Sequence, residues 1–203
     1  MIYVVGDIHG CVEPLMKLMD QVKLTQDDRL IFIGDYIDRG PDPKGVIDYL
    51  FTLKGNITFL MGNHEQMFLN YLDGKDKFLF LLNGGNATLR SYGGPSNIPE
   101  AHLQFFKGLH LYDETDEYLF VHAGLRPGIP MEQQNPEDLL WIRGEFIYYP
   151  KRYPKTIVFG HTPMEEVLML PDRIGIDTGC VYGGKLTCLV LPSRELIQVE
   201  NHR

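Results

Sequence analysis

The sequence predicts an α/β protein of layered α+β character, in which a two-sheet β-sandwich is flanked by helices. Short apolar runs rich in Val, Ile and aromatic residues recur along the chain, and half of them are followed by glycine, which is typical of buried strands. In the first half, segments with helical spacing lie between these runs, which indicates alternating strands and helices. The last quarter is mostly strands joined by tight turns, which favours two sheets over one wound sheet.

The strand-like runs come first. Eight of them have this form, and they cover residues 2–5, 30–33, 57–61, 118–121, 156–159, 174–176, 186–191 and 196–199. Five of the runs lead directly into a polar cluster that contains Asp, Asn or His. Because the carboxyl ends of strands in an open α/β sheet face the ligand-binding crevice, these clusters are candidates for the functional site.

Three helices are expected between the early runs. Their apolar faces are Val12, Leu15, Met16, Met19 and Val22 in the first, Val46, Ile47, Leu50 and Phe51 in the second, and Met67, Phe68, Tyr71 and Leu72 in the third. Between residues 73 and 117 the pattern loosens. Weaker helices are expected there, and the glycine-rich stretches 83–86 and 92–94 are expected to be loops, for which a place beside a substrate is one interpretation.

Length and charge narrow the classes of function. A chain of 203 residues is expected to form a single catalytic domain, 1–203. Its formal charge of −8 argues against a broad nucleic-acid or membrane surface. The three cysteines form no CxxC pair, and no signal peptide or long apolar span is evident, so buried thiols and a cytoplasmic location are expected.

The polar residues at the strand ends form a potential metal site. They are Asp7, His9, Asp35, Asp38, Asn63, His64, His122 and His161. Mixed carboxylate, imidazole and amide ligands suit Mn²⁺, Fe²⁺ or Zn²⁺ better than Ca²⁺. Six of these residues as ligands would fit two ions if one carboxylate bridges them, and such a pair of ions is used by phosphatases and nucleases.

In this order, the clusters GDIHG (6–10), GDYIDRG (34–40), GNHE (62–65), HAG (122–124) and GHT (160–162) resemble the phosphoprotein phosphatase (PPP) family of the calcineurin-like metallophosphoesterases. The segment LWIRGEF (140–146) resembles a further Arg-Gly motif of that family. The resemblance covers residues 6 to about 180. It implies a β-sandwich with a dinuclear centre, for which Mn²⁺ is the expected metal and Fe or Zn are alternatives.

The resemblance also implies a role for each matched position. Asp7, His9 and Asp35 would hold one metal, and Asp35, Asn63, His122 and His161 would hold the second, with Asp35 bridging. His64 and Asp38 would form a catalytic dyad in which His64 protonates the leaving oxygen. Arg39, Arg143 and Asn63 would bind the substrate phosphate, which a hydroxide between the metals would attack in line.

Two substrates remain open at this point. Asp38 and Glu65 match the protein phosphatases and favour a small bacterial-type serine/threonine phosphatase that acts on phosphoprotein or phosphopeptide, with no regulatory subunits indicated. The segment 176–189, IDTGCVYGGKLTCL, instead resembles the symmetrical bis(5′-nucleosyl)-tetraphosphatases, which hydrolyse diadenosine tetraphosphate. A scaffold that had lost catalysis should lack some of these residues, and none is missing.

Residues outside these motifs are assigned structural roles. His102 and His110 are expected to be solvated or to cap helices, and Asp177 to stabilise a turn. Trp141 is expected to pack beside Arg143, and Tyr36 either packs or rims the pocket.

Overall fold

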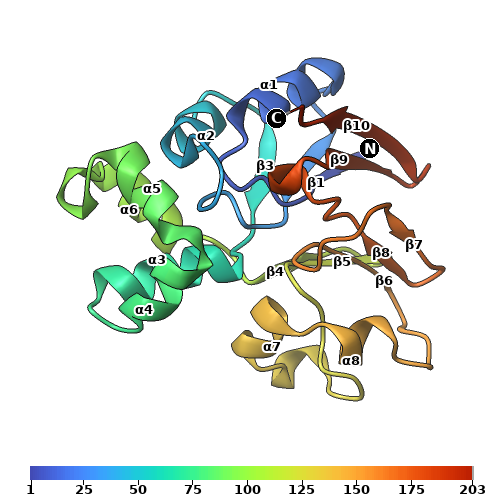
Figure 1. Cartoon of the computed structure of the whole chain (residues 1–203). Helices are drawn as coiled ribbons and strands as arrows, with labels where there is room; N and C mark the ends of the chain where they lie inside the picture. The colour runs from blue at the N-terminus through green and yellow to red at the C-terminus, as the bar shows by residue number, and fades with distance from the viewer. Residues whose placement is uncertain (203) are drawn as a thin grey trace.

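Two five-stranded mixed sheets face each other in the computed structural model, which describes residues 1–202 (Figure 1). The first sheet has the order β10-β9-β1-β2-β3. Its strands are β1 (Ile2–Val5), β2 (Arg29–Phe32), β3 (Asn56–Phe59), β9 (Lys185–Leu191) and β10 (Glu195–Glu200). The neighbours β1, β2 and β3 are parallel, whereas β9 runs antiparallel to β1 and β10.

The second sheet has the order β4-β5-β6-β8-β7. Its strands are β4 (Tyr112–Glu114), β5 (Tyr118–Val121), β6 (Thr156–Phe159), β7 (Leu168–Met169) and β8 (Arg173–Gly175). The central strands β5, β6 and β8 are parallel, and the edge strands β4 and β7 are antiparallel to their neighbours. The predicted two-sheet sandwich is therefore confirmed.

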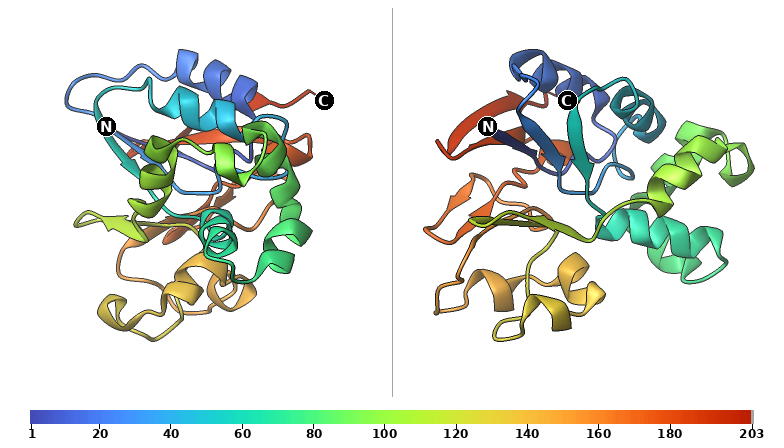
Figure 2. Two further views of the ribbon diagram at one scale, coloured as in Figure 1. Left: turned by 90° about the vertical axis from the view of Figure 1, so that its left-hand side faces the viewer. Right: turned by 180° about the vertical axis from the view of Figure 1, so that it is seen from behind.

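Helices cover the outer faces of both sheets and one side of the sandwich (Figures 1 and 2). They are α1 (Val12–Gln21), α2 (Pro43–Leu50), α3 (Asn63–Leu72), α4 (Lys77–Phe80), α5 (Asn86–Tyr92), α6 (Glu100–Lys107), α7 (Pro136–Trp141) and α8 (Gly144–Ile147). The helices α1 and α2 lie over the first sheet, α7 and α8 lie over the second, and α3 to α6 stand at one side. None of the helices within residues 1–202 is long and apolar enough to cross a membrane.

Alternation along the strands builds the core. Val4 and Ile31 point between the sheets, where they pack with Phe120 and Val158 of the second sheet. Their neighbours, such as Val5, point the other way into the cluster beneath the helices. This period of two is what a strand buried on both faces requires, and it explains why these runs are apolar throughout.

The eight predicted strands are confirmed, with ends that shift by one or two residues. The short edge strands β4 and β7 were not predicted. The stretch predicted as a loop at 83–86 instead begins within a π-helical turn, Leu81–Gly85, and leads into α5. Gly84 has a φ of +97° in that turn, which glycine adopts without strain.

Candidate active site

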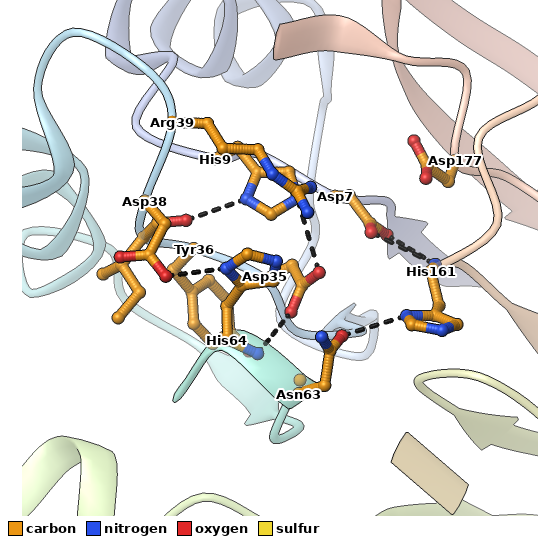
Figure 3. Close-up of polar contacts among 12 residues, drawn as sticks. Asp7, His9, Asp35, Tyr36, Asp38, Arg39, Asn63, His64, His161 and Asp177 are labelled. Atoms are coloured by element: carbon orange, nitrogen blue, oxygen red, sulfur yellow. Dashed lines mark hydrogen bonds and ion pairs between the residues drawn. The ribbon is translucent and has the colours of Figure 1, made fainter. Parts of the chain in front are cut away.

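The predicted polar residues do converge. Asp7, Asp35 and His122 follow β1, β2 and β5, whereas Asn63 and His64 open α3 just after β3. Parallel strands β1, β2 and β3 end at one edge of the first sheet, and β5 and β6 end at the facing edge of the second. Figure 3 shows the side chains from both sheets turned toward one another across this edge.

Backbone strain is concentrated at the same place. Seven non-glycine residues within the described chain have positive φ, and five of them are His9, Asp35, Asp38, Arg39 and His161. The left-handed conformation costs a side-chain-bearing residue of order 1–3 kcal/mol and persists only where the surroundings enforce it. The fold therefore holds these five residues in conformations that aim their side chains into the cluster.

Two glycines permit the close approach between loops. A Cβ atom on Gly62 would lie 2.1 Å from Oδ1 of Asp35, and one on Gly160 would lie 2.1 Å from Oδ1 of Asp7. Any larger residue at either position would push the carboxylate out of place.

Asp35 lies at the centre of the cluster. Its Oδ2 is 3.3 Å from Nε2 of His9, and its Oδ1 is 3.4 Å from Nε2 of His122. Oδ1 also accepts the backbone N–H of His64 at 3.1 Å. All four residues are buried, so water does not screen the charge of this carboxylate.

The histidines have the orientation of metal ligands. Nδ1 of His9 donates to the carbonyl oxygen of Ile37, and Nδ1 of His122 donates to that of Ile33, both at 2.8 Å. Because a carbonyl can only accept, Nδ1 of each ring keeps a proton, and Nε2, which faces Asp35, is the nitrogen that can bind a metal once its own proton is displaced. A second nitrogen fixed in this way is typical of metal-ligating histidines.

Two sets of side chains offer ligand atoms that lie within 4.8 Å of one another. One set is His9, Asp35 and His64, and the other is Asp35, His122 and His161. Asp35 belongs to both sets, as a bridging carboxylate should. The amide oxygen of Asn63 adds a further donor, 2.9 Å from Nε2 of His122 and from Nδ1 of His161. These residues therefore fit a pair of divalent cations.

Asp7 is predicted from the sequence to be a metal ligand beside His9, and this role stays a prediction. Its two carboxylate oxygens accept the backbone N–H of His161 at 3.2 and 3.1 Å, and the compact set around His9 contains His64 in its place. Asp7 lies between His9 and His161 in Figure 3.

The protonation of the cluster reflects the shared carboxylate. Burial opposes a charge on His9 and His122, but Asp35 outweighs it and raises their pKa values to about 9 and about 10. Burial and the neighbouring His122 lower the pKa of His161 to about 2. A bound cation would replace the protons that now balance Asp35, because metal ligands bind in their deprotonated forms.

His64 and Asp38 form a buried pair. Nδ1 of His64 lies 2.6 Å from Oδ2 of Asp38, and burial lowers the pKa of His64 while it raises that of Asp38 to about 7. Thr88 orients Asp38 through two hydrogen bonds, because its hydroxyl donates to Oδ1 at 2.5 Å and accepts the Asp38 N–H at 3.0 Å. Nε2 of His64 is buried and has no hydrogen-bond partner within residues 1–202.

The two arginines reach the cluster from opposite sheets. Nη1 of Arg39 lies 2.8 Å from Nε2 of His9, and Nε of Arg143 donates to Nε2 of His161 at 3.1 Å. Arg39 also lies over the ring of Tyr182, with 5.7 Å between Cζ and the ring centroid. Two guanidinium groups therefore flank the site, where they can bind a phosphate.

The structural role of Glu65 was not predicted from the sequence, where this residue served only to distinguish protein phosphatases from tetraphosphatases. The side chain is fully buried, and it accepts the backbone N–H groups of Asp35, Tyr36, Ile37 and Gly62 at 2.8 to 3.3 Å. Glu65 thereby fixes the loop that carries Asp35. Glu65 is the third residue of α3, a position from which a glutamate can reach back to the backbone N–H of the N-cap residue, here Gly62, so the sequence carried a signal for that one contact.

The remaining predicted residues have structural surroundings. Tyr36 packs in the core, and its hydroxyl donates to the carbonyl of Leu60 at 2.7 Å, so it does not rim the pocket. Asp177 accepts the Gly179 N–H at 3.0 Å, which confirms the turn. The half-buried Trp141 packs its ring against that of His161.

The expectation for His102 was wrong. Its ring is buried against Tyr92, whose hydroxyl lies 2.8 Å from Nδ1. Since the partner comes from a different helix, spacing along the chain could not reveal it.

Comparison with known proteins places this site in a family. The sequence profile described as calcineurin-like phosphoesterase matches residues 1–191. The chain belongs to this family. It is accordingly a metallophosphoesterase, a hydrolase of phosphate esters, and its histidine and aspartate groups fit the dinuclear metal dependence of calcineurin-like phosphoesterases.

Relatives within the calcineurin-like phosphoesterases differ in substrate. The chain is 34% identical over 196 residues to serine/threonine-protein phosphatase 1 of Salmonella typhimurium, covering 92% of this chain and 89% of the relative. It is 29% identical over 233 residues to the asymmetrical bis(5′-nucleosyl)-tetraphosphatase PrpE of Oceanobacillus iheyensis, covering 98% and 92%. A crystal structure of a suggested diadenosine tetraphosphatase aligns with a TM-score of 0.80 and 27% identity, over 100% of this chain and 94% of that one.

Proposed function

We propose that the chain is a metal-dependent phosphomonoesterase that acts on phosphoserine and phosphothreonine in proteins, as one catalytic domain over residues 1–203. The observation that carries the proposal is the position of His64. Its Nε2 is buried and unpartnered within the described residues, whereas its Nδ1 is held by Asp38. A histidine held in this way can donate a proton to a leaving oxygen that enters the site.

The metal ligands are proposed to be Asp7, His9, Asp35, Asn63, His122 and His161, with Asp35 shared. Two divalent cations held there, with Mn²⁺ the expected metal, would supply Lewis-acid chemistry for the phosphate oxygens and would lower the pKa of a water molecule. The backbone carbonyls that hold Nδ1 of His9 and His122 keep both rings in the ligating orientation without further reorganisation.

The protein residues then bind and orient the substrate. Arg39 and Arg143 grip the phosphate oxygens through their guanidinium groups, with Asn63 as a further phosphate contact. Because the pKa of Asp38 is raised to about 7, the pair of Asp38 and His64 can hold two protons, one between Oδ2 and Nδ1 and one on Nε2. Nε2 of His64 delivers the second proton to the ester oxygen as the bond to phosphorus breaks, so the product leaves as a neutral alcohol. Asp38, held in turn by Thr88, keeps the imidazole directed at that oxygen.

The alternative is symmetrical bis(5′-nucleosyl)-tetraphosphatase activity, which the segment 176–189 favours. Several curated relatives are named for tetraphosphatase activity, though of the asymmetrical kind. The two kinds differ in products, because cleavage at the central linkage of diadenosine tetraphosphate yields two ADP, whereas asymmetrical cleavage yields ATP and AMP.

A substrate panel tests the proposal. Protein with Mn²⁺ is assayed on phosphoserine, phosphothreonine and phosphotyrosine peptides and on diadenosine tetraphosphate, and the metals bound as purified are analysed. Efficient phosphate release from the phosphoserine and phosphothreonine peptides is the expected result. Efficient cleavage of the dinucleotide alone would overturn the protein-phosphatase assignment, and the nucleotide products would identify the cleaved linkage.

A further inference from the structure

A hollow of about 530 Å³ lies beside Arg39, outside the cluster already described. Its lining residues are Arg39, Gly40, Pro41, Ala87, Arg90 and Ser91. The first three belong to the loop that follows β2, and the last three belong to α5. Arg39 therefore connects the hollow to the site, because its Nη1 reaches His9 at the other end of the side chain.

The charge of the hollow favours an anion. Two arginine residues and no acidic residue line it. Because Nη1 of Arg39 lies at His9, Arg90 is the residue whose guanidinium group is available to a ligand in the hollow. Arg90 is exposed and forms no ion pair within residues 1–202, whereas Arg29 pairs with Asp113, and Arg126 with Asp138. In a chain of net charge −8, a guanidinium group without a carboxylate beside a phosphate site is suited to a substrate oxyanion.

The helix that presents Arg90 is firmly anchored to the Arg39 loop. One residue further along α5, the hydroxyl of Ser91 donates to Oδ1 of Asp42 at 3.0 Å and accepts the backbone N–H of Lys44 at 2.9 Å. Two residues earlier, Thr88 holds Asp38 through its paired hydrogen bonds. The backbone of Arg90 therefore has a fixed position relative to Arg39, as a preorganised binding site requires.

We propose that this hollow is a second anion subsite, in which Arg90 binds a further phosphoryl group of the substrate whose scissile phosphate lies at Arg39. The inference rests on the proposed phosphoesterase function and adds a substrate class to it, namely molecules with two phosphoryl groups close together. That chemistry has two sources, the oligophosphate chain of a dinucleotide or a peptide with two phosphorylated residues. A substrate with one phosphoryl group leaves the subsite without a ligand.

The experiment compares substrates with one and two phosphoryl groups. KM is measured for p-nitrophenyl phosphate, for a phosphoserine peptide, for the same peptide with a second phosphoserine nearby, and for diadenosine tetraphosphate. The proteins are the wild type, Arg90→Ala, Arg90→Lys and Arg152→Ala. Arg152 is a matched control, because it is also exposed, forms no ion pair in the described chain and lines a different hollow.

Arg90→Ala should raise the ratio of the KM for a doubly phosphorylated substrate to that for p-nitrophenyl phosphate by about tenfold, which corresponds to about 1.4 kcal/mol. Arg90→Lys should give an intermediate ratio, because lysine keeps the charge and loses the bidentate fork. Arg152→Ala should leave the ratio unchanged. The experiment also distinguishes the two sources of the second phosphoryl group. The KM ratio rises for the peptide if the subsite binds a second phosphorylated residue, and for the dinucleotide if it binds the oligophosphate chain.

Three results would overturn the proposal, and they differ in what else they refute. If p-nitrophenyl phosphate is hydrolysed but Arg90→Ala changes neither ratio by more than about twofold, the subsite is refuted and the phosphoesterase function stands. If metal-loaded protein hydrolyses none of the substrates, the proposed function fails and the subsite fails with it. Equal ratios in Arg90→Ala and Arg152→Ala would show a general charge effect in place of a subsite.

Discussion

The carboxylate of Glu65 offers a sharp test of how the metal-site loop is held. Its Oε1 accepts the N–H groups of Tyr36 and Ile37, and its Oε2 accepts those of Asp35 and Gly62. Glu65→Gln keeps the shape of the side chain but turns one acceptor oxygen into an NH₂ donor. Whichever position the nitrogen takes, two backbone N–H groups face another donor in a fully buried site.

The magnitude follows from those two lost hydrogen bonds. A buried donor left without a partner costs about 1–3 kcal/mol, so the pair costs about 2–6 kcal/mol. Burial raises the pKa of Glu65 to about 7, so removing the buried carboxylate recovers part of that cost. A net destabilisation of about 2–4 kcal/mol remains, which for a chain of this size lowers the melting temperature by roughly 4–16 °C.

The assay combines thermal unfolding with metal analysis of protein loaded with Mn²⁺. Because Asp35 has a φ of +54° that this loop must enforce, the variant should also bind less metal. Glu100→Gln is the control, since Glu100 is exposed in the first turn of α6 and its substitution should change stability by less than about 0.5 kcal/mol. A Glu65→Gln protein with wild-type melting temperature and metal content would refute the reasoning.

Substitutions at four further positions test the site and the core. Asp35→Asn should lower the content of both metals and abolish turnover. Substantial turnover in the metal-replete variant would contradict the role of Asp35 as a ligand shared by the two metals. His64→Asn should retain both metals and slow turnover by about 10²–10⁴-fold, most for poor leaving groups, because a proton donor is lost. A fall in metal content would instead identify His64 as a metal ligand. Thr88→Val should slow turnover and shift the pH profile of turnover at constant metal content, and Thr88→Ser should restore both the rate and the profile. Equal pH profiles for the two variants would show that the hydroxyl of Thr88 does not position Asp38. Burial lowers the pKa of His102 in the folded state. The neutral ring therefore stabilises the fold fully above its ordinary pKa of about 6.5, and this stabilisation is lost as the pH falls below that value. The melting-temperature gap between the wild type and His102→Gln, measured by calorimetry, should therefore narrow from about pH 8 to about pH 5, and a constant gap would count against this linkage.

Much of the fold could be predicted because its signals are local. A buried strand must be apolar on both faces, and the run of Val4 and Val5 shows this directly, with one residue between the sheets and the other beneath the helices. The edge strands β4 and β7 lacked such a signal, because they have three and two residues and are partly exposed. The π-helical turn at Leu81–Gly85 also had none, since it depends on Gly84 packing against Arg39.

For the site, the sequence predicted which residues gather but not which of them contact one another. The sequence by itself determined which side chains gather at the strand ends, because parallel strands bring their carboxyl ends to one edge. It also determined the family, through the order and content of five motifs. Those features depend on residue type and local spacing, and the structure retains them.

Only the tertiary structure decided which of these residues contact one another. Thr88 lies 50 positions from Asp38, and Glu65 lies 30 positions from Asp35, yet both pairs are in hydrogen-bond contact. The hollow between Arg39 and Arg90 likewise exists because α5 packs on the loop after β2. Such contacts depend on how loops and helices pack over long separations, and residue spacing along the chain carries no record of that packing.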